Sequence, residues 1–262
     1  MQRQPNDRLP RFADLRRGYF RLFLLSLCVL AVYFALDAAG RLSIPARFAW
    51  IGGFLVLSYA AARWYLRVVH GMTDGRETAD GDCADATLSV RVLLPLFALY
   101  FALYLHLLLT LTLLDPSLGR DLMFAENSRA YYMEWYFNLR PFGTIWTVYL
   151  EAGLGKGLLS LRSVLYNIGG NLAALSPLAF FLPLFWCPMR HAYVFLPTVV
   201  LTAAAIEGLQ FAFMRGSCDI DDLLLNAGGA FAVYLILRIP PLSRLVRRLT
   251  AGLWDVPRRE ER

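Results

Sequence analysis

Apolar residues fall in six blocks along this chain, and polar residues gather between the blocks. The blocks occupy residues 19–36, 47–68, 92–114, 164–186, 192–214 and 222–237. A helix of about 20 apolar residues is long enough to cross the hydrocarbon core of a bilayer. The pattern therefore predicts an all-α fold, a polytopic membrane helix bundle of about six transmembrane helices.

Composition favours a membrane protein over a soluble one. Hydrophobic residues make up 58% of the 262 residues and charged residues 18%, whereas about 25% of the residues in soluble domains are charged. The four cysteines show no C-x-x-C spacing, so a disulfide framework is not expected. We expect a multi-pass protein of the cell membrane.

The basic residues predict the orientation of the bundle. Of the 26 Lys and Arg residues, 18 lie in the N-terminal segment, the connection 63–91, the loop 187–191 and the tail from Arg238. With six spans, all four segments lie on the same side, which the positive-inside rule makes cytoplasmic. Both termini are therefore predicted to be cytoplasmic. The net charge of +6 follows from this topology, and no nucleic-acid partner is expected.

Four parts of the chain are predicted from the spacing of the blocks. They are an N-terminal cytoplasmic segment with a helix pair (1–70), a mobile cytoplasmic loop rich in Gly and Asp (71–91), a four-helix membrane domain (92–238) and a basic cytoplasmic tail (239–262). Within the tail, apolar residues from Leu242 to Leu253 fall at helical spacing, with Arg244, Arg247 and Arg248 on the other side. This pattern is typical of a short amphipathic helix on an anionic inner leaflet.

The outward connection 115–163 contains a dense group of aromatic residues. They are Tyr131, Tyr132, Trp135, Tyr136, Phe137, Phe142, Trp146 and Tyr149. Tyr and Trp prefer the level of the lipid headgroups, where a ring is half wet. This connection is therefore predicted to be an interfacial aromatic segment along the outer membrane surface.

Polar side chains from three predicted spans lie at similar depth in the outer half of the bilayer. The fourth span supplies Asn167 and Asn171, the fifth Glu207 and Gln210, and the sixth Asp222 and Asn226. A carboxylate facing lipid costs several kcal/mol, so Glu207 is expected to face the bundle or a wet cavity. Glycine pairs at 169–170 and 228–229 are expected to let the fourth and sixth spans pack closely around it.

These polar residues have two interpretations. In one, they form a site open to the outer leaflet. Asp219, Asp221 and Asp222, with Glu207, offer hard oxygen ligands for Mg²⁺ or Ca²⁺, or Glu207 acts as a catalytic acid or base. Arg140 and Arg215 would bind a phosphate or carboxylate headgroup.

In the other interpretation, the same residues are structural. The aspartates would cap the sixth span, and the Asn and Gln side chains would form interhelical hydrogen bonds. The sequence contains no Ser-His-Asp arrangement, H-E-x-x-H motif or phosphate loop, so it permits a reaction without requiring one.

Four motifs in order resemble the VanZ-like family of bacterial membrane proteins, over roughly residues 92–238. They are NLRPF at 138–142, Asn171 followed by SPLAFFLP at 176–183, EGLQ at 207–210, and RGSCDIDDLLLNAGG at 215–229. Ala179 stands where the family usually has glycine. The resemblance implies an envelope role, because the family takes its name from a protein that confers resistance to teicoplanin, a lipid-tailed glycopeptide.

We therefore expect an outward-facing acidic pocket that binds a cell-envelope amphiphile, either a membrane lipid, a lipid-linked envelope precursor or a lipoglycopeptide. The expected ligand-binding residues are Arg140, Asn167, Asn171, Glu207, Gln210, Arg215, Asp219, Asp221, Asp222 and Asn226. One alternative is a membrane enzyme that modifies a lipid or polysaccharide headgroup, with or without a metal. A second alternative is a structural membrane scaffold.

Overall fold

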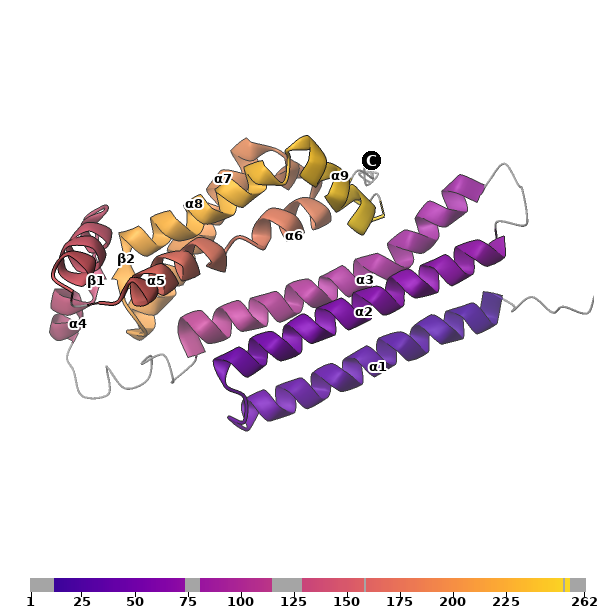
Figure 1. Cartoon of the computed structure of the whole chain (residues 1–262), viewed down its shortest axis with the longest axis horizontal. Coiled ribbons are helices and arrows are strands. Elements are labelled where there is room, and N and C mark those ends of the chain that lie inside the picture. Colours follow the sequence, from indigo (N-terminus) through magenta and orange to yellow (C-terminus); the bar gives the residue numbers. More distant parts are fainter. Residues whose placement is uncertain (1–11, 74–80, 115–128, 158, 252, 255–262) are drawn as a thin grey trace, which may run out of the picture. The chain divides into compact units, whose positions relative to one another are not determined.

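The computed structural model describes residues 12–73, 81–114, 129–157, 159–251 and 253–254, and these residues are almost entirely helical (Figure 1). Five helices among them are long and apolar enough to cross a membrane, and a sixth counts if the bent pair α8–α9 is one span. The predicted all-α, multi-pass membrane fold is confirmed.

The chain divides into two units, Met1–Tyr100 and Phe101–Arg262. The first contains α1 (Phe12–Ala38), α2 (Ile44–Thr73) and most of α3 (Gly81–Leu109). An ion pair of 2.6 Å between Arg47 Nε and Asp37 Oδ1 joins α1 to α2 across their turn. Residues 81–91, expected in a loop, are helical in α3. Residues 74–80 of the predicted loop lie outside the described residues, and the predicted domain boundaries stay predictions.

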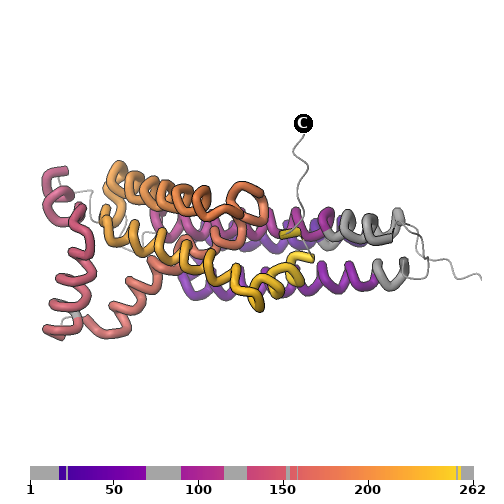
Figure 2. The backbone as a smooth tube through the Cα atoms, turned by 90° about the horizontal axis from the view of Figure 1, so that it is seen from above, coloured from indigo at the N-terminus to yellow at the C-terminus, as the bar shows by residue number. Residues whose placement is uncertain are grey.

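The second unit contains the end of α3, the candidate membrane spans Leu161–Phe185 and Ala192–Phe213, and the bent pair α8–α9. Its elements after α3 are η1 (Thr110–Leu114), α4 (Arg129–Trp135), β1 (Phe137–Asn138), η3 (Thr144–Gly155), α5 (Leu161–Ala174), α6 (Leu178–Phe185), η4 (Cys187–Arg190), α7 (Ala192–Phe213), β2 (Cys218–Asp219), α8 (Ile220–Ile236) and α9 (Pro240–Leu249). Helix α8 packs against both α5 and α7, and η3 runs across the direction of α7 and α8 (Figure 2).

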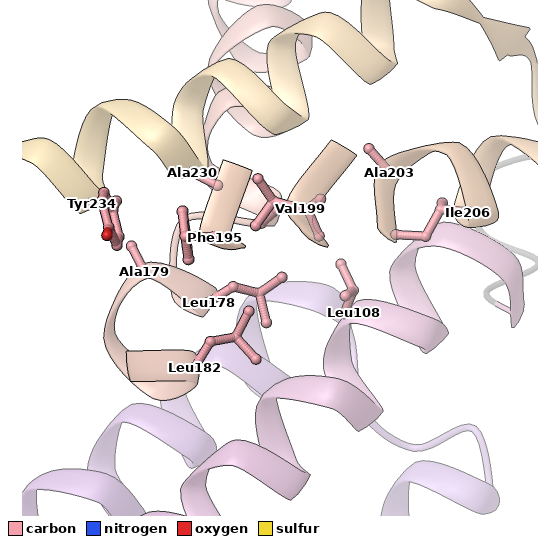
Figure 3. Packing of buried hydrophobic residues seen from close by; sticks show 11 residues of the cluster. Leu108, Leu178, Ala179, Leu182, Phe195, Val199, Ala203, Ile206, Ala230 and Tyr234 are labelled. Carbon is pink, nitrogen blue, oxygen red and sulfur yellow. The ribbon is translucent and has the colours of Figure 1, made fainter. Parts of the chain in front are cut away.

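The core of this unit lies toward the end where α6 and η4 are found. Side chains from α3, α6, α7 and α8 meet there (Figure 3). Phe195 of α7 and Tyr234 of α8 are fully buried and stack with their ring centroids 4.2 Å apart. Apolar packing therefore holds one end of the unit, and the polar residues of α7 and α8 are concentrated toward the other.

The predicted span 164–186 is broken into α5 and α6 just before Pro177. The Leu178 amide bonds to the Leu175 carbonyl at 3.0 Å, so the Ala174 carbonyl does not receive the usual helical bond from Leu178. The hydroxyl of Tyr104 donates to this carbonyl at 2.8 Å. The break follows from the ring of Pro177, which removes a backbone donor and disfavours helix at the preceding residue.

Helices α5 and α8 approach closely at Gly229. A Cβ atom placed on Gly229 would lie 2.0 Å from the Leu172 carbonyl oxygen of α5. At Gly169, Gly170 and Gly228, an added Cβ would have no neighbour within 4 Å. The expectation of close packing is therefore right for Gly229 and wrong for the other three glycines, because neither Gly228 on α8 nor the pair on α5 has an atom within 4 Å of where a Cβ would lie.

We predict that Gly229→Ala destabilises the protein, because the new methyl group would clash with backbone that cannot move aside. Overpacking of this kind costs about 1–3 kcal/mol. Thermal unfolding of the purified protein in detergent would show a lower Tm. In the matched control, Gly228→Ala, we expect no loss, since alanine is favoured over glycine inside a helix by about 0.5–1 kcal/mol. Equal Tm values for the two variants would contradict the prediction.

Candidate functional site

Strands β1 and β2 join the outward connection to the turn between α7 and α8. The strands are parallel, with Phe137 opposite Cys218 and Asn138 opposite Asp219. The Cys218 amide also donates to the Tyr136 carbonyl at 2.8 Å. We call residues 129–155, which comprise α4, β1 and η3, the surface segment. This strand pair brings the surface segment against the acidic residues at the start of α8.

Asp219 is buried and accepts three hydrogen bonds. As the N-cap of α8, it accepts the Asp221 amide at 2.9 Å, as the structural interpretation expects. It also accepts the Asn138 side-chain amide at 3.2 Å and the Thr144 hydroxyl. A single carboxylate therefore joins the first turn of α8 to both β1 and η3.

Asp221, only 1% exposed, holds the beginning of η3. Its two oxygens accept the backbone amides of Phe142 and of Ile145, the latter at 3.0 Å. The first amides of any helix lack partners within that helix, and they attract negative charge. Asp221 therefore caps η3 from a neighbouring helix.

Glu207 faces the interior of the unit, as expected from the cost of exposing a carboxylate to lipid. It is 6% exposed, and its Oε2 accepts the Asp219 amide at 2.9 Å. Glu207, Asp219 and Asp221 thus form one hydrogen-bonded network, which we call the acidic junction.

Two further predicted residues connect α7 to the end of α3. Gln210 donates through Nε2 to the Thr112 carbonyl at 3.1 Å, and Arg215 donates through Nη1 to the Leu113 carbonyl at 2.9 Å. Both carbonyls belong to the π-helical turn η1. In such a turn, backbone carbonyls lack their usual α-helical donors. The side chains of Gln210 and Arg215 act as donors to two of these carbonyls.

The remaining predicted residues lie beside the junction or outside it. Asn171 of α5 donates to Asp222 of α8, and Asn226 is buried on α8. Asn167 is exposed and bonds to the Ser163 carbonyl of its own helix at 2.9 Å. Arg140 is exposed on the surface segment. The structure therefore gathers the acidic residues and leaves the side chains of Asn167 and Arg140 exposed, while ligand binding by any of these residues stays a prediction.

Sequence reasoning missed two members of the network. Asn138 bonds to both Thr144 and Asp219, and its Oδ1 accepts the Arg140 amide at 2.9 Å. Asn138 is the first residue of the NLRPF motif, so the resemblance contained a signal for it. Thr144 had no such signal, because its partner lies far along the chain.

The carboxylate oxygens that were expected to bind a cation accept hydrogen bonds instead. Among the described residues, no group of three or more His, Cys, Asp and Glu side chains is arranged to hold a metal ion. Asp219 and Asp221 direct their oxygens to amide and hydroxyl donors, and Asp222 accepts from Asn171. The geometry gives no support to the Mg²⁺ or Ca²⁺ hypothesis for these three aspartates.

Burial and the nearby acidic residues together raise the pKa of two side chains beside the acidic junction. Burial, and then the charges of Glu207 and Asp219, raises the pKa of the Cys218 thiol to about 11. Burial, followed by the charges of the three aspartates, raises the pKa of Tyr149 in η3 to about 12. The thiol and the phenol both stay protonated at neutral pH, so Cys218 is a poor nucleophile there.

The outer side of the surface segment is apolar and exposed. Trp135, Leu139, Phe142 and Trp146 are each more than 60% exposed, and Arg140 lies among them in sequence. Large apolar side chains exposed together mark an interaction surface. The predicted interfacial segment therefore has the side chains that such a position requires, while residues 115–128 lie outside the described residues.

Comparison with known proteins places most of this unit in one family. A family model described as VanZ/LLP1 matches residues 101–241, more than half of the chain. The match includes the surface segment, the acidic junction and all of α8. No curated protein and no solved structure matches the chain.

We predict that Asp221→Ala loosens the start of η3, because two buried amides lose their acceptor. The loss of a helix cap costs about 0.5–2 kcal/mol. Hydrogen exchange of the Phe142 and Ile145 amides should become about 2- to 30-fold faster, the range that corresponds to this cost. Glu134→Ala, which removes an exposed carboxylate from α4, is the control and should leave both amides protected. Unchanged exchange in Asp221→Ala would show that the cap contributes nothing.

We also predict slow alkylation of Cys218 in a protein whose other cysteines are replaced by serine. With a pKa of about 11, about one thiol in a thousand is ionised at pH 8. The rate of reaction with iodoacetamide should rise about tenfold per pH unit between pH 8 and pH 10. Unfolded protein is the control, since its thiol has an ordinary pKa. A rate that levels off near pH 9 in the folded protein would contradict the raised pKa.

Proposed function

This chain belongs to the VanZ/LLP1 family, and on that premise we propose that it is a VanZ-like membrane protein that binds a cell-envelope amphiphile at its outward end. The contacts are made by the exposed side of the surface segment. The observation behind this proposal is that an exposed aromatic surface, which includes the exposed Arg140, is fixed to the membrane bundle by buried carboxylates.

The apolar side chains of the surface segment suit the boundary between headgroups and acyl chains. Trp135 and Trp146 are both 65% exposed, and Phe142 is 64% exposed. Tryptophan is enriched at this level of a bilayer. An amphiphile in the outer leaflet would place its chain against these rings and its polar end near the adjacent backbone.

Arg140 is the side chain in this segment best suited to an anionic group. It is exposed, and its backbone is fixed by the Asn138 side chain, whose Oδ1 accepts the Arg140 amide at 2.9 Å. A guanidinium group binds phosphate or carboxylate through two parallel hydrogen bonds. Phospholipids, lipid-linked precursors and lipoglycopeptides all offer such an anion.

In this proposal, the acidic junction positions the binding surface and does not itself contact the amphiphile. Each member accepts a backbone amide, Glu207 from Asp219, Asp219 from Asp221, and Asp221 from Ile145. A carboxylate used in this way stays in place, because without its donors the buried charge would have no hydrogen-bond partner. The acidic pocket expected from the sequence is thereby replaced by an acidic support beneath an aromatic surface.

The phenotype to measure is protection against teicoplanin, because a lipid-tailed drug is an outer-leaflet amphiphile. Bacteria expressing the wild type, Arg140→Gln or an empty vector would be compared at matched membrane levels. We expect the wild type to raise the inhibitory concentration of teicoplanin but not of vancomycin. We expect Arg140→Gln to lose most of this protection, since it removes the anion contact from an exposed position.

Lys156→Gln is the matched control, because it removes one positive charge from another exposed side chain near the same end of the unit. It should protect like the wild type. Equal loss in both variants would show that only the total charge matters. Full protection by Arg140→Gln would remove Arg140 from the proposal, and no protection by the wild type would detach this protein from teicoplanin.

A further inference from the structure

Helix α9 leaves the bundle at nearly a right angle. The axes of α8 and α9 differ by 89°, with a break of three residues between them. Pro240 at the start of α9 favours this abrupt restart, since its ring presets the first helical turn. If α8 by itself is the sixth predicted span (residues 222–237), a helix at 89° to it runs along the membrane plane.

The exposure of its side chains divides α9 into three stripes. Val246 and Thr250 are buried against the protein. Leu245 and Leu249, one position earlier on the helix, are 48% and 41% exposed. One position earlier again are Arg244 and Arg248, both exposed. Residues four apart share a face and adjacent residues are about 100° apart, so the apolar stripe lies between the buried stripe and the basic stripe.

Contacts just before and just after α9 hold this helix against the neighbouring helices. The ring of Trp254, just after α9, packs on Phe180 of α6 with centroids 5.8 Å apart. Arg238, just before α9, stacks on the Tyr234 ring with its guanidinium carbon 3.5 Å from the centroid, and it donates to the Arg190 carbonyl. The orientation of the three stripes is therefore set by the protein.

Among the described residues, the charged side chains at this end of the unit are all basic. Arg190, Arg238, Arg244, Arg247 and Arg248 lie there, whereas the sequence has no Asp or Glu at 152–206 or at 223–254. A basic stripe beside an apolar stripe, on a helix parallel to the membrane, matches a leaflet that offers both phosphate groups and acyl chains. An acidic protein segment would satisfy the arginines and leave Leu245 exposed to water.

We propose that α9 is a binding surface for anionic phospholipid headgroups in the leaflet that the charge distribution makes cytoplasmic. Leu245 and Leu249 enter the acyl boundary, and Arg244 and Arg248 contact the phosphates. This surface lies at the opposite end of the unit from the surface segment, and it is independent of amphiphile binding there.

The test measures the Tm of the purified full-length protein in detergent micelles, with phosphatidylglycerol or phosphatidylcholine of the same chain length added. A ligand that binds only the folded state raises the Tm. We expect phosphatidylglycerol to raise the Tm of the wild type by about 2–4 °C more than phosphatidylcholine does. This difference should shrink as the salt concentration rises, because salt screens the attraction.

Two double variants remove the same charge from opposite ends of the unit. Arg244→Gln/Arg248→Gln should lose at least half of the difference between the two lipids. Lys156→Gln/Arg162→Gln, at exposed positions near the other end, should keep it. Arg244→Lys/Arg248→Lys, which preserves the charge, should also keep most of it. If the first double variant does not fold, the single substitutions Arg244→Gln and Arg248→Gln replace it.

Two results would overturn the proposal. One is an equal effect of both lipids on the wild type, which would leave the basic stripe to an acidic protein partner. The other is an undiminished preference for phosphatidylglycerol in the Arg244→Gln/Arg248→Gln protein, which would place the anionic lipid elsewhere on the chain.

Discussion

The carboxylate of Asp219 is the constraint on which the β2 end of the second unit depends. It accepts the Asp221 amide in the first turn of α8, the side-chain amide of Asn138 and the hydroxyl of Thr144, while the Asp219 backbone amide donates to Glu207. A buried carboxylate is tolerated only when donors replace the water it has lost. Helix α8, strand β1 and helix η3 must therefore be correctly placed together, because each provides a donor to this carboxylate. Helix α7 is joined to them because Glu207 accepts the Asp219 amide.

The two ends of the second unit are stabilised by different kinds of interaction. Near η4 and α9, apolar packing and stacked rings hold the helices, and the exposed charges are arginines. Near β2, carboxylates accept backbone amides, and the exposed side chains are aromatic. The first arrangement suits a cytoplasmic surface rich in anionic lipid, and the second suits an outward surface where amphiphiles are half immersed. The arginines near α9 thus fit the predicted orientation in the membrane, and the carboxylates near β2 stabilise the local backbone.

The sequence predicted the helices well because apolar runs are a local property. It also predicted that Glu207 faces inward, since a carboxylate facing lipid is costly. Capping of α8 by Asp219 was one of the two interpretations that it left open. It did not predict the cap that Asp221 provides for η3, because the partners are far apart in the chain. Nor did it separate Gly229 from Gly228, since that choice depends on how α8 is rotated toward α5.

The cap of η3 leaves the outer surface open to change during evolution. Asp221 recognises Phe142 and Ile145 through their backbone amides, which almost any residue supplies. Side chains at exposed positions such as Leu139, Phe142 and Trp146 are therefore not needed for attachment. Substitutions at Leu139 and Trp146 would leave the attachment of the segment intact, so the chemistry of this exposed surface can change while its support stays the same.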